Sequence, residues 1–316
     1  MFSLIQNELI KIFKRPGTYV MIALLILLTV ITAAFIKYQQ DGSEVEEDKN
    51  WKQILVAENE ALKQQVKNSG AQMEQDYLNR EIAINDYRIK HDLSPSEEYN
   101  MWSFVTSASE LIQLAGLFTI IIAAGIVASE FSWGTIKLLL IRPITRAKIL
   151  LSKYLTVLIY ALVMVSILFV LSTIIGAILF GVPEQASPYL NYYNGVVTEQ
   201  NIIVHLIVFY VLKSIDMIML ATMAFMISAV FRNSSLAIGL SLFLMFMGGQ
   251  VTFLIAMKYS WAKYLLFANT DLMQYFEGSP VVEGMTLPFS VSMLIIYFLI
   301  FIGLALYVFK KRDVAA

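Results

Sequence analysis

The chain has 316 residues, of which 58% are hydrophobic and only 15% are charged. Soluble domains are about 45–50% apolar and about 25% charged, so this composition argues against a soluble globular protein. The charges are also concentrated, because residues 41–103 contain 14 Asp or Glu and 7 Lys or Arg. An apolar body with one polar insert is the composition of an integral membrane protein.

Several kinds of chemistry are excluded by what the sequence lacks. Cysteine is absent, which excludes disulfides, thiolate metal sites and a cysteine nucleophile, and only two histidines occur. No G-x-x-x-x-G-K-[ST] phosphate loop, H-E-x-x-H or G-x-S-x-G motif is present. We therefore expect no catalytic residue, no metal site and no cofactor in this chain.

The first 40 residues predict a short amphipathic helix followed by a membrane span. Apolar residues recur at helical spacing from Phe2 to Phe13, with polar residues between them. Such a helix would lie along the membrane interface, although an ordinary basic flank is the alternative. Pro16-Gly17 then turns the chain into the first span, which we interpret as an uncleaved anchor because no clear signal-peptide cleavage site is present.

Six apolar stretches are long enough to cross the bilayer, which takes about 20 helical residues. They are Tyr19–Ile36, Phe104–Ala128, Leu155–Phe180, Ile202–Val230, Leu236–Met257 and Pro288–Phe309. The chain therefore divides into residues 1–40, the polar insert 41–103, and residues 104–316 with spans two to six. The fold class that we predict is an all-α integral membrane protein.

The distribution of basic residues predicts the orientation. Twelve Lys or Arg residues fall on one side of the membrane, and the opposite short loops carry only Lys258 and Lys263. Because basic residues collect in cytoplasmic loops, we expect both termini to be cytoplasmic and the 41–103 insert to be extracellular.

The polar insert is rich in Glu, Lys, Gln, Ala and Leu and predicts helix. One helix of about 50 residues would extend ~75 Å, yet the chain must return to the membrane. Asn68-Ser69-Gly70 is the best break, which predicts a helical hairpin. Two roles remain open for it, a cap that binds a partner or gates substrate, and a solvated spacer.

The densest cluster of motif residues lies between spans two and three, at residues 128–153. Gly134 allows the backbone to turn, Thr135 can cap a short helix, and Pro143 ends it. Thr145 can then cap the next helix, which leads into the third span. We expect the short helix at 135–146 to lie across the cytoplasmic face, flanked by basic side chains. The residues that we expect to carry its function are Glu130, Gly134, Thr135, Lys137, Leu138, Leu139, Ile141, Arg142, Pro143 and Arg146.

This segment resembles the permease subunits of ABC-2 type transporters. The resemblance is carried, in this order and spacing, by Glu130, Gly134-Thr135, Lys137, Leu138-Leu139, Pro143, Thr145-Arg146 and Lys153. The resemblance extends over nearly the whole chain, because it includes the amphipathic helix before the first span, here called the lead helix, as well as the six spans and the cytoplasmic termini. It implies that the turn is a coupling helix, which docks in a cleft of a separate ATPase subunit. The long 41–103 insert departs from the family, since many members have a short first outer loop.

The resemblance implies a transmembrane permease subunit of an ATP-driven exporter in a bacterial cell membrane. ATP and Mg²⁺ would be bound by the partner ATPase, and a second copy or a sibling permease would complete the pathway. The expected cargo is an antimicrobial peptide, a drug or a lipid-like compound, and we expect no nucleic-acid partner. Two other classes stay open: a non-transporting sensor or assembly factor that uses the hairpin, and an ion-coupled carrier, which the few intramembrane charges disfavour.

Lys213, Asp216 and Glu110 are the ionisable residues inside or near the spans to which we assign a candidate role. Lys213 and Asp216 are three residues apart in the fourth span, so they share a helix face and are expected to neutralise each other. Such a pair indicates either a site in the transport path or an internal ion pair. Glu110, near the outer end of the second span, is expected to face a vestibule.

The last outer loop, residues 259–276, is amphipathic and aromatic. We expect Asn269-Thr270-Asp271 to cap a short helix that runs to Phe276. In the resembled family, short helices at this place dip into the outer leaflet; an interfacial aromatic belt is the alternative.

Overall fold

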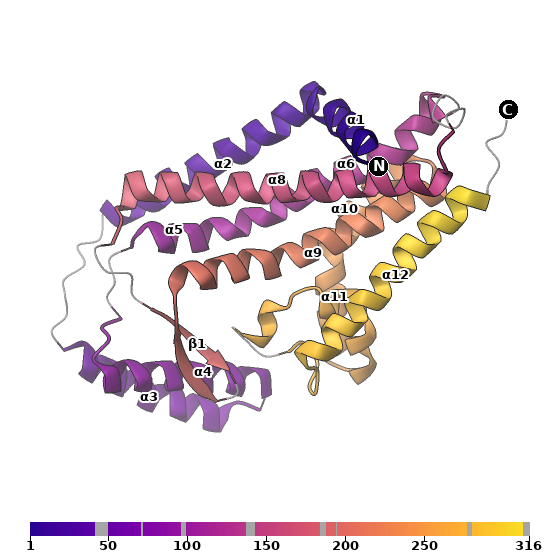
Figure 1. Cartoon of the computed structure of the whole chain (residues 1–316). Helices are drawn as coiled ribbons and strands as arrows, with labels where there is room; N and C mark the ends of the chain where they lie inside the picture. Colours follow the sequence, from indigo (N-terminus) through magenta and orange to yellow (C-terminus); the bar gives the residue numbers. More distant parts are fainter. Residues whose placement is uncertain are drawn as a thin grey trace.

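The computed structural model describes residues 1–41, 50–70, 72–95, 99–136, 143–183, 188–193, 195–276 and 280–311. Within these ranges six helices are long and apolar enough to cross a membrane, which confirms the predicted number of spans. The protein is thus a predominantly helical, multi-pass membrane protein (Figure 1). The spans are α2 (Pro16–Asp41), α5 (Met101–Ala108) continued by η1 (Ser109–Leu111) and α6 (Ile112–Ser132), α8 (Arg146–Phe180), α9 (Ile202–Phe231), α10 (Ser234–Ala256) and α12 (Leu287–Lys311).

Asparagine side chains begin three of the membrane helices. Asn100 Oδ1 accepts hydrogen bonds from the backbone N–H groups of Trp102 and Ser103 at the start of α5. Asn201 and Asn233 cap α9 and α10 in the same way. A side-chain oxygen at this position satisfies backbone donors that have no partner within the helix.

The helix α6 forms the centre of the bundle and packs against α8, α9 and α10. Small residues allow these close approaches: Ala115, Ala123 and Ala124 have no exposed surface. The hydroxyl of Ser228 in α9 donates to the carbonyl oxygen of Ala124 at 2.6 Å and accepts from the N–H of Ala128 at 3.0 Å. The central helix is therefore fixed to α9 by packing and by hydrogen bonds.

The polar insert contains the predicted helical hairpin. Its helices α3 (Trp51–Asn68) and α4 (Gln72–His91) pack against each other and are joined at the predicted break. Asn59 of α3 bonds to both Asp86 and Asn85 of α4, at 2.7 and 3.1 Å. These polar contacts, together with buried Leu55 and Leu78, hold the two helices in register.

A two-stranded antiparallel hairpin, which we did not predict, lies beside α4. Its strands are β1 (Tyr189–Tyr193) and β2 (Val196–Gln200), with Tyr193 paired to Val196. Tyr87 of α4 donates to the carboxylate of Glu199 at 3.2 Å. Together the helical hairpin and the β-hairpin form one cap over the ends of the spans.

The last predicted loop folds into short pieces. They are η2 (Ser260–Tyr264), α11 (Leu266–Asn269) and η3 (Met273–Tyr275). Asp271 precedes the last of these, whose N-cap is Leu272, and its carboxylate accepts from the N–H of Met273 at 2.9 Å. Asn269 is instead fully buried and accepts a hydrogen bond from Ser290 at 2.7 Å. The expected helix to Phe276 is therefore reduced to a single 3₁₀ turn.

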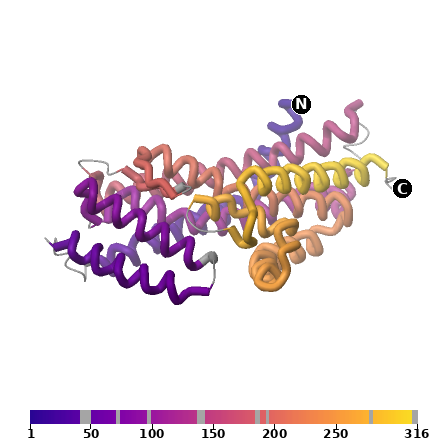
Figure 2. Tube along the Cα trace, turned by 90° about the horizontal axis from the view of Figure 1, so that it is seen from below, coloured from indigo at the N-terminus to yellow at the C-terminus, as the bar shows by residue number. Residues whose placement is uncertain are grey.

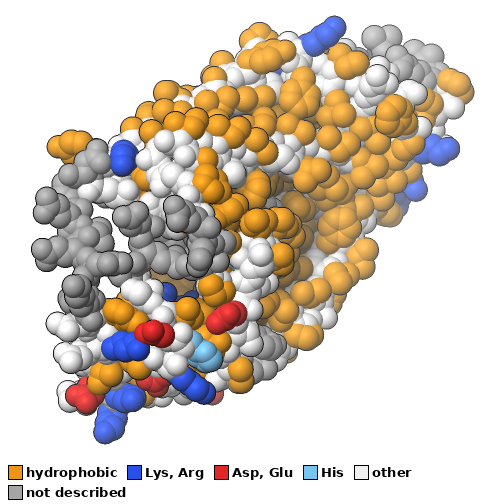
Figure 3. Space-filling view, turned by 60° about the vertical axis from the view of Figure 1, so that its left-hand side comes forward, with side chains coloured by type: hydrophobic (Ala, Val, Ile, Leu, Met, Phe, Trp, Pro, Cys, Tyr) orange, Lys and Arg blue, Asp and Glu red, His pale blue; other side chains and the backbone are white. Residues whose placement is uncertain are grey.

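The two ends of the bundle differ in composition. Figures 1 and 2 place both termini at one end, here called the terminal end, and the cap at the other, here called the hairpin end. Hydrophobic side chains cover most of the surface between them, and charged side chains gather over the cap (Figure 3). This distribution fits a body surrounded by lipid with one large polar surface at the hairpin end.

Candidate functional site

The strongest candidate site is at the terminal end, where the chain leaves α6. Gly134 adopts a positive φ of +71°, which lets the chain reverse direction after the helix. The hydroxyl of Thr135 donates to the carboxylate of Glu130, so this threonine closes the turn after α6, and the helix that it is expected to cap lies largely outside the described residues. Thr145 caps α8 as predicted, because its hydroxyl accepts from the N–H of Lys148. The base of the turn is thus fixed at both sides.

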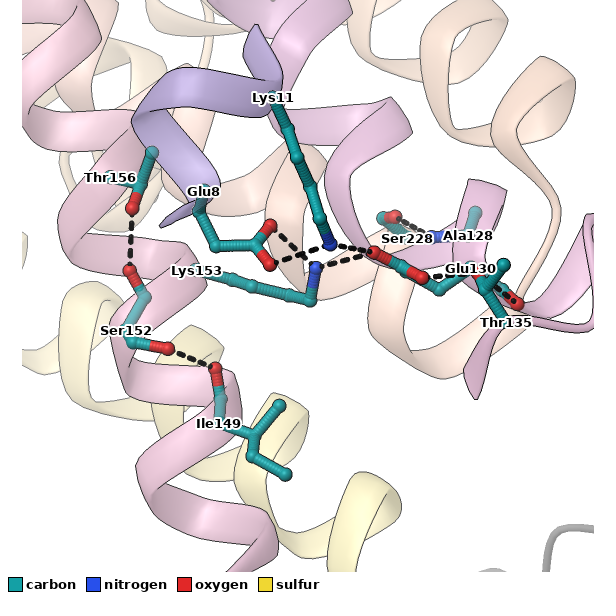
Figure 4. A network of polar contacts seen from close by, with 10 residues as sticks. All are labelled: Glu8, Lys11, Ala128, Glu130, Thr135, Ile149, Ser152, Lys153, Thr156 and Ser228. Atoms are coloured by element: carbon teal, nitrogen blue, oxygen red, sulfur yellow. Dashed lines mark hydrogen bonds and ion pairs between the residues drawn. The ribbon is translucent and has the colours of Figure 1, made fainter. Parts of the chain in front are cut away.

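Four charged side chains from three helices meet at this base and form what we call the ionic cluster: Glu8, Lys11, Glu130 and Lys153 (Figure 4). Glu8 and Lys11 belong to α1 (Phe2–Phe13), Glu130 to α6 and Lys153 to α8. The two carboxylates balance the two ammonium groups, so the cluster has no net charge.

Each ammonium group of the ionic cluster bridges both carboxylates. Lys11 Nζ lies 3.0 Å from an oxygen of Glu8 and 3.0 Å from an oxygen of Glu130. Lys153 Nζ lies 2.7 Å from Glu8 and 3.0 Å from Glu130. The cluster therefore links the lead helix, the end of the second span and the start of the third.

The ionic cluster is largely removed from water. Lys153 is 1% exposed, while Glu8 and Glu130 are 7% and 6% exposed. Lys11 lies on the more exposed side of the cluster. Burial lowers the pKa of Lys11, but the combined effect of the two carboxylates is larger, so the pKa is raised above its usual value. Buried charges of this kind hold a fixed geometry, and breaking one pair costs about 3–5 kcal/mol because a partner is left uncompensated.

The helix α1 has the predicted amphipathic pattern, but part of its polar face is buried in the protein. It packs on α8 and α2, with Ile12 2% exposed and the ring of Phe13 6.0 Å from that of Tyr160. Thr18 donates to the carbonyl oxygen of Ile12 at 2.6 Å and fixes the bend into α2. The lead helix is therefore a packed element of the bundle at this end.

The role of Glu8 was missed in the sequence, although a signal was present. Glu8 is the sole acidic residue among the first 40, and Glu130 is the sole acidic residue between Glu110 and Glu184. Isolated carboxylates within basic and apolar segments indicate internal partners, since a buried charge must be paired. Lys153, which belongs to the resembled motif, is the partner that they share.

Half of the predicted coupling residues lie outside the described part of the chain: Lys137, Leu138, Leu139, Ile141 and Arg142. At the described margins, Arg146 donates to the carbonyl oxygen of Lys310 at 3.2 Å, so it contacts the end of α12. Trp133 is 65% exposed, and the guanidinium carbon of Arg15 lies 5.3 Å from the centroid of its ring. The margins of the turn thus present one large aromatic surface and basic groups at the terminal end.

The predicted pairing of Lys213 with Asp216 is wrong. Lys213 Nζ lies 2.6 Å from the carboxylate of Glu110, at the start of the second span, and 4.9 Å from the ring of Phe209. Asp216 instead interacts with the hydroxyl of Thr270 and lies near Asp271. The spacing put Lys213 and Asp216 on one side of α9, but residues from neighbouring elements are better placed to bond to each of them.

Comparison with known proteins assigns the chain to a family. A family model described as "Protein of unknown function (DUF2705)" matches residues 73–315. The chain is 50% identical to the uncharacterized protein YhcI of Bacillus subtilis (strain 168), over all of both chains. It is 31% identical to the uncharacterized membrane protein YdbK of the same organism, over 70% of this chain and 87% of that one. The chain belongs to the DUF2705 family.

Proposed function

We propose that this chain is the membrane-spanning permease subunit of an ATP-driven exporter of ABC-2 type. The observation that carries the proposal is the ionic cluster at the base of the turn after α6. A turn that only connected two spans would not require a buried ionic joint to the lead helix. A turn that receives force from a soluble partner does require one, because the force must reach several helices together.

The ionic cluster suggests how ATP-driven movement would reach the membrane helices. ATP and Mg²⁺ would be bound by two separate ATPase subunits, and their closure would displace the 135–146 segment. Glu130 would pass the displacement to the end of α6, Lys153 to α8, and Glu8 to the lead helix. Because each ammonium group contacts both carboxylates, the three helix ends would move as one body.

The same proposal sets the orientation and the assembly. Both termini and the turn would be cytoplasmic, in line with the excess of Lys and Arg at that end. The cap would face the outside of a bacterial cell membrane. A second copy or a sibling permease would complete the transport path, and the cargo would be an antimicrobial peptide, a drug or a lipid-like compound.

A membrane sensor or assembly factor is the second candidate, and the cap favours it. A cavity of about 550 Å³ lies between α4, β1 and the start of α5, with Arg80, Arg88 and Trp102 on its wall. A site at this position could bind a ligand without any transport. The two candidates differ in their partner, since only the exporter needs an ATPase at the terminal end.

Co-purification with an ATPase subunit tests the proposal. Leu139→Asp should abolish the association, because it would bury an unpaired charge in the docking cleft. Ile54→Asp, at a half-exposed apolar position on α3, is the matched control and should keep the ATPase bound. Normal co-purification and normal transport by Leu139→Asp would show that this turn is not the coupling element.

A further inference from the structure

A second group of charged residues lines a cavity at the hairpin end of the bundle. The cavity has a volume of about 290 Å³ and lies between α6, α9, α10 and the segment that follows α11. Its charged wall residues are Glu110, Lys213, Asp216 and Asp271. Three acidic groups and one basic group give this wall a net negative charge, in contrast to the neutral ionic cluster.

The single base on this wall is already paired. Lys213 forms an ion pair with Glu110 at 2.6 Å and contacts the ring of Phe209, so its positive charge balances the charge of one carboxylate. Asp216 and Asp271 remain, and they lie close enough to repel each other. Among the described residues that line the cavity, no further Lys or Arg balances these two carboxylates. The cavity therefore attracts a positive charge.

An independent observation at the same wall also indicates a missing partner. Ser109 is 1% exposed, and its hydroxyl oxygen has no hydrogen-bond partner in the part of the chain that the structure describes. Buried polar groups are nearly always hydrogen-bonded, so an unpaired hydroxyl on a cavity wall requires an explanation. A ligand with N–H donors would supply the partner that the protein does not.

Part of the cavity wall is apolar and adaptable. It is formed by Met217 and Leu220 of α9, Met245 of α10 and Ile112 of α6. Methionine side chains are flexible and polarizable, and they fit apolar groups of varied shape. The cavity thus has both negatively charged and apolar wall residues.

We propose that this cavity binds an organic cation, namely a protonated amine or a guanidinium group carried on a small apolar body. The charged group would lie between Asp216 and Asp271 and donate to their oxygens and to the hydroxyl of Ser109. The apolar body would lie against Met217, Leu220 and Met245. The ligand charge would relieve the repulsion between the two carboxylates, and burial of its apolar part would add to the affinity.

The proposal goes beyond the exporter assignment and does not depend on it. The same site would serve a transported cargo, a sensed ligand or a bound modulator. Its test is therefore a binding measurement on the full chain without any ATPase, so a negative result would leave the proposed coupling function in place.

The test compares two probes of almost equal shape by calorimetry, using the full chain in phosphatidylcholine nanodiscs. Phenethylamine should bind saturably, whereas phenethyl alcohol, which lacks the charge, should show only the background of empty nanodiscs. Asp216→Asn keeps the size of the side chain and its contact with Thr270, and should weaken phenethylamine binding about tenfold. Glu60→Gln removes an exposed carboxylate on α3 and should leave binding unchanged.

Lys213→Met provides a result of opposite sign. Removing the base frees the carboxylate of Glu110, so the amine should bind about threefold more tightly. Equal binding of both probes to the unaltered chain would overturn the proposal, whether or not any variant folds. Loss of amine binding in Lys213→Met would also overturn it, because a site for a cation cannot require that ammonium group.

Discussion

The two charged regions of this protein are built on different principles. At the terminal end, Glu8, Lys11, Glu130 and Lys153 form a neutral set in which both ammonium groups contact both carboxylates. At the hairpin end, the cavity wall has three carboxylates and one ammonium group, which is paired with Glu110. In the first region Glu8, Glu130 and Lys153 are buried, whereas the charged residues of the second line a cavity.

This difference distinguishes the ionic cluster, which connects helices, from the cavity, which can bind a ligand. A buried set with balanced charges needs no further partner, so it fixes the relative positions of the helices that carry it. A cavity with unbalanced charge attracts a ligand of opposite sign, because its low-dielectric walls strengthen the field. The neutral cluster therefore suits the transmission of force, and the negative cavity suits recognition.

The largest effect is expected from Lys153→Met. This change leaves the buried carboxylates of Glu8 and Glu130 with only Lys11 between them, at a cost of about 3–5 kcal/mol. We expect little monodisperse protein in detergent and a strongly lowered apparent Tm. Lys148→Met, at an exposed position on the same helix, is the matched control and should behave as the unaltered chain.

A double variant tests whether charge balance is the cause. Glu130→Leu combined with Lys153→Met leaves Glu8 and Lys11 as one balanced pair, so yield and Tm should largely recover relative to Lys153→Met alone. If the single and the double variant lose the same stability, the cluster is not held by the balance of its charges.

An intermediate effect is expected from Glu8→Gln. The amide keeps the shape but loses the charge that both lysines contact, which corresponds to about 1.5–3 kcal/mol. The lead helix should then loosen, so that a cysteine introduced at Ile12, which is 2% exposed, reacts faster with a thiol reagent. Unchanged labelling at this position would mean that apolar contacts alone hold α1 on α8.

The smallest effect on stability is expected from Glu110→Gln. Its pair with Lys213 is not buried within the protein, since the two side chains are 77% and 26% exposed, and exposed pairs contribute at most about 1 kcal/mol. The apparent Tm should change little, while amine binding in the cavity should weaken because Lys213 loses its partner. A loss of stability as large as that of Lys153→Met would remove the distinction between the two regions.

Local sequence patterns predicted the long helices of the fold. Runs of apolar residues predicted the six spans, the break at Ser69-Gly70 predicted the helical hairpin, and Thr145 was identified as the cap of α8. The β-hairpin was missed, although aromatic and β-branched residues flank the Asn194-Gly195 dipeptide, which is a strong hairpin signal.

Contacts between distant elements could not be predicted in this way. Glu8 and Lys153 are 145 residues apart, and they meet because the lead helix packs back onto α8. Helical spacing correctly placed Lys213 and Asp216 on one side of α9, but it could not show that Glu110 and Thr270 lie closer to them. A single sequence contains the candidates for a charged site, and the packing of helices decides which of them pair.

Site-directed crosslinking is the most direct test of the claim that the turn after α6 contacts an ATPase. The chain has no cysteine, so a benzophenone maleimide can be attached at one introduced position. Trp133→Cys places it beside the turn and Trp261→Cys places it at the hairpin end; both tryptophans are exposed, by 65% and 51%. Irradiation of membranes should give an adduct with the ATPase subunit from position 133 and none from position 261. An adduct from position 261, or none from position 133 while the ATPase still co-purifies, would contradict the account.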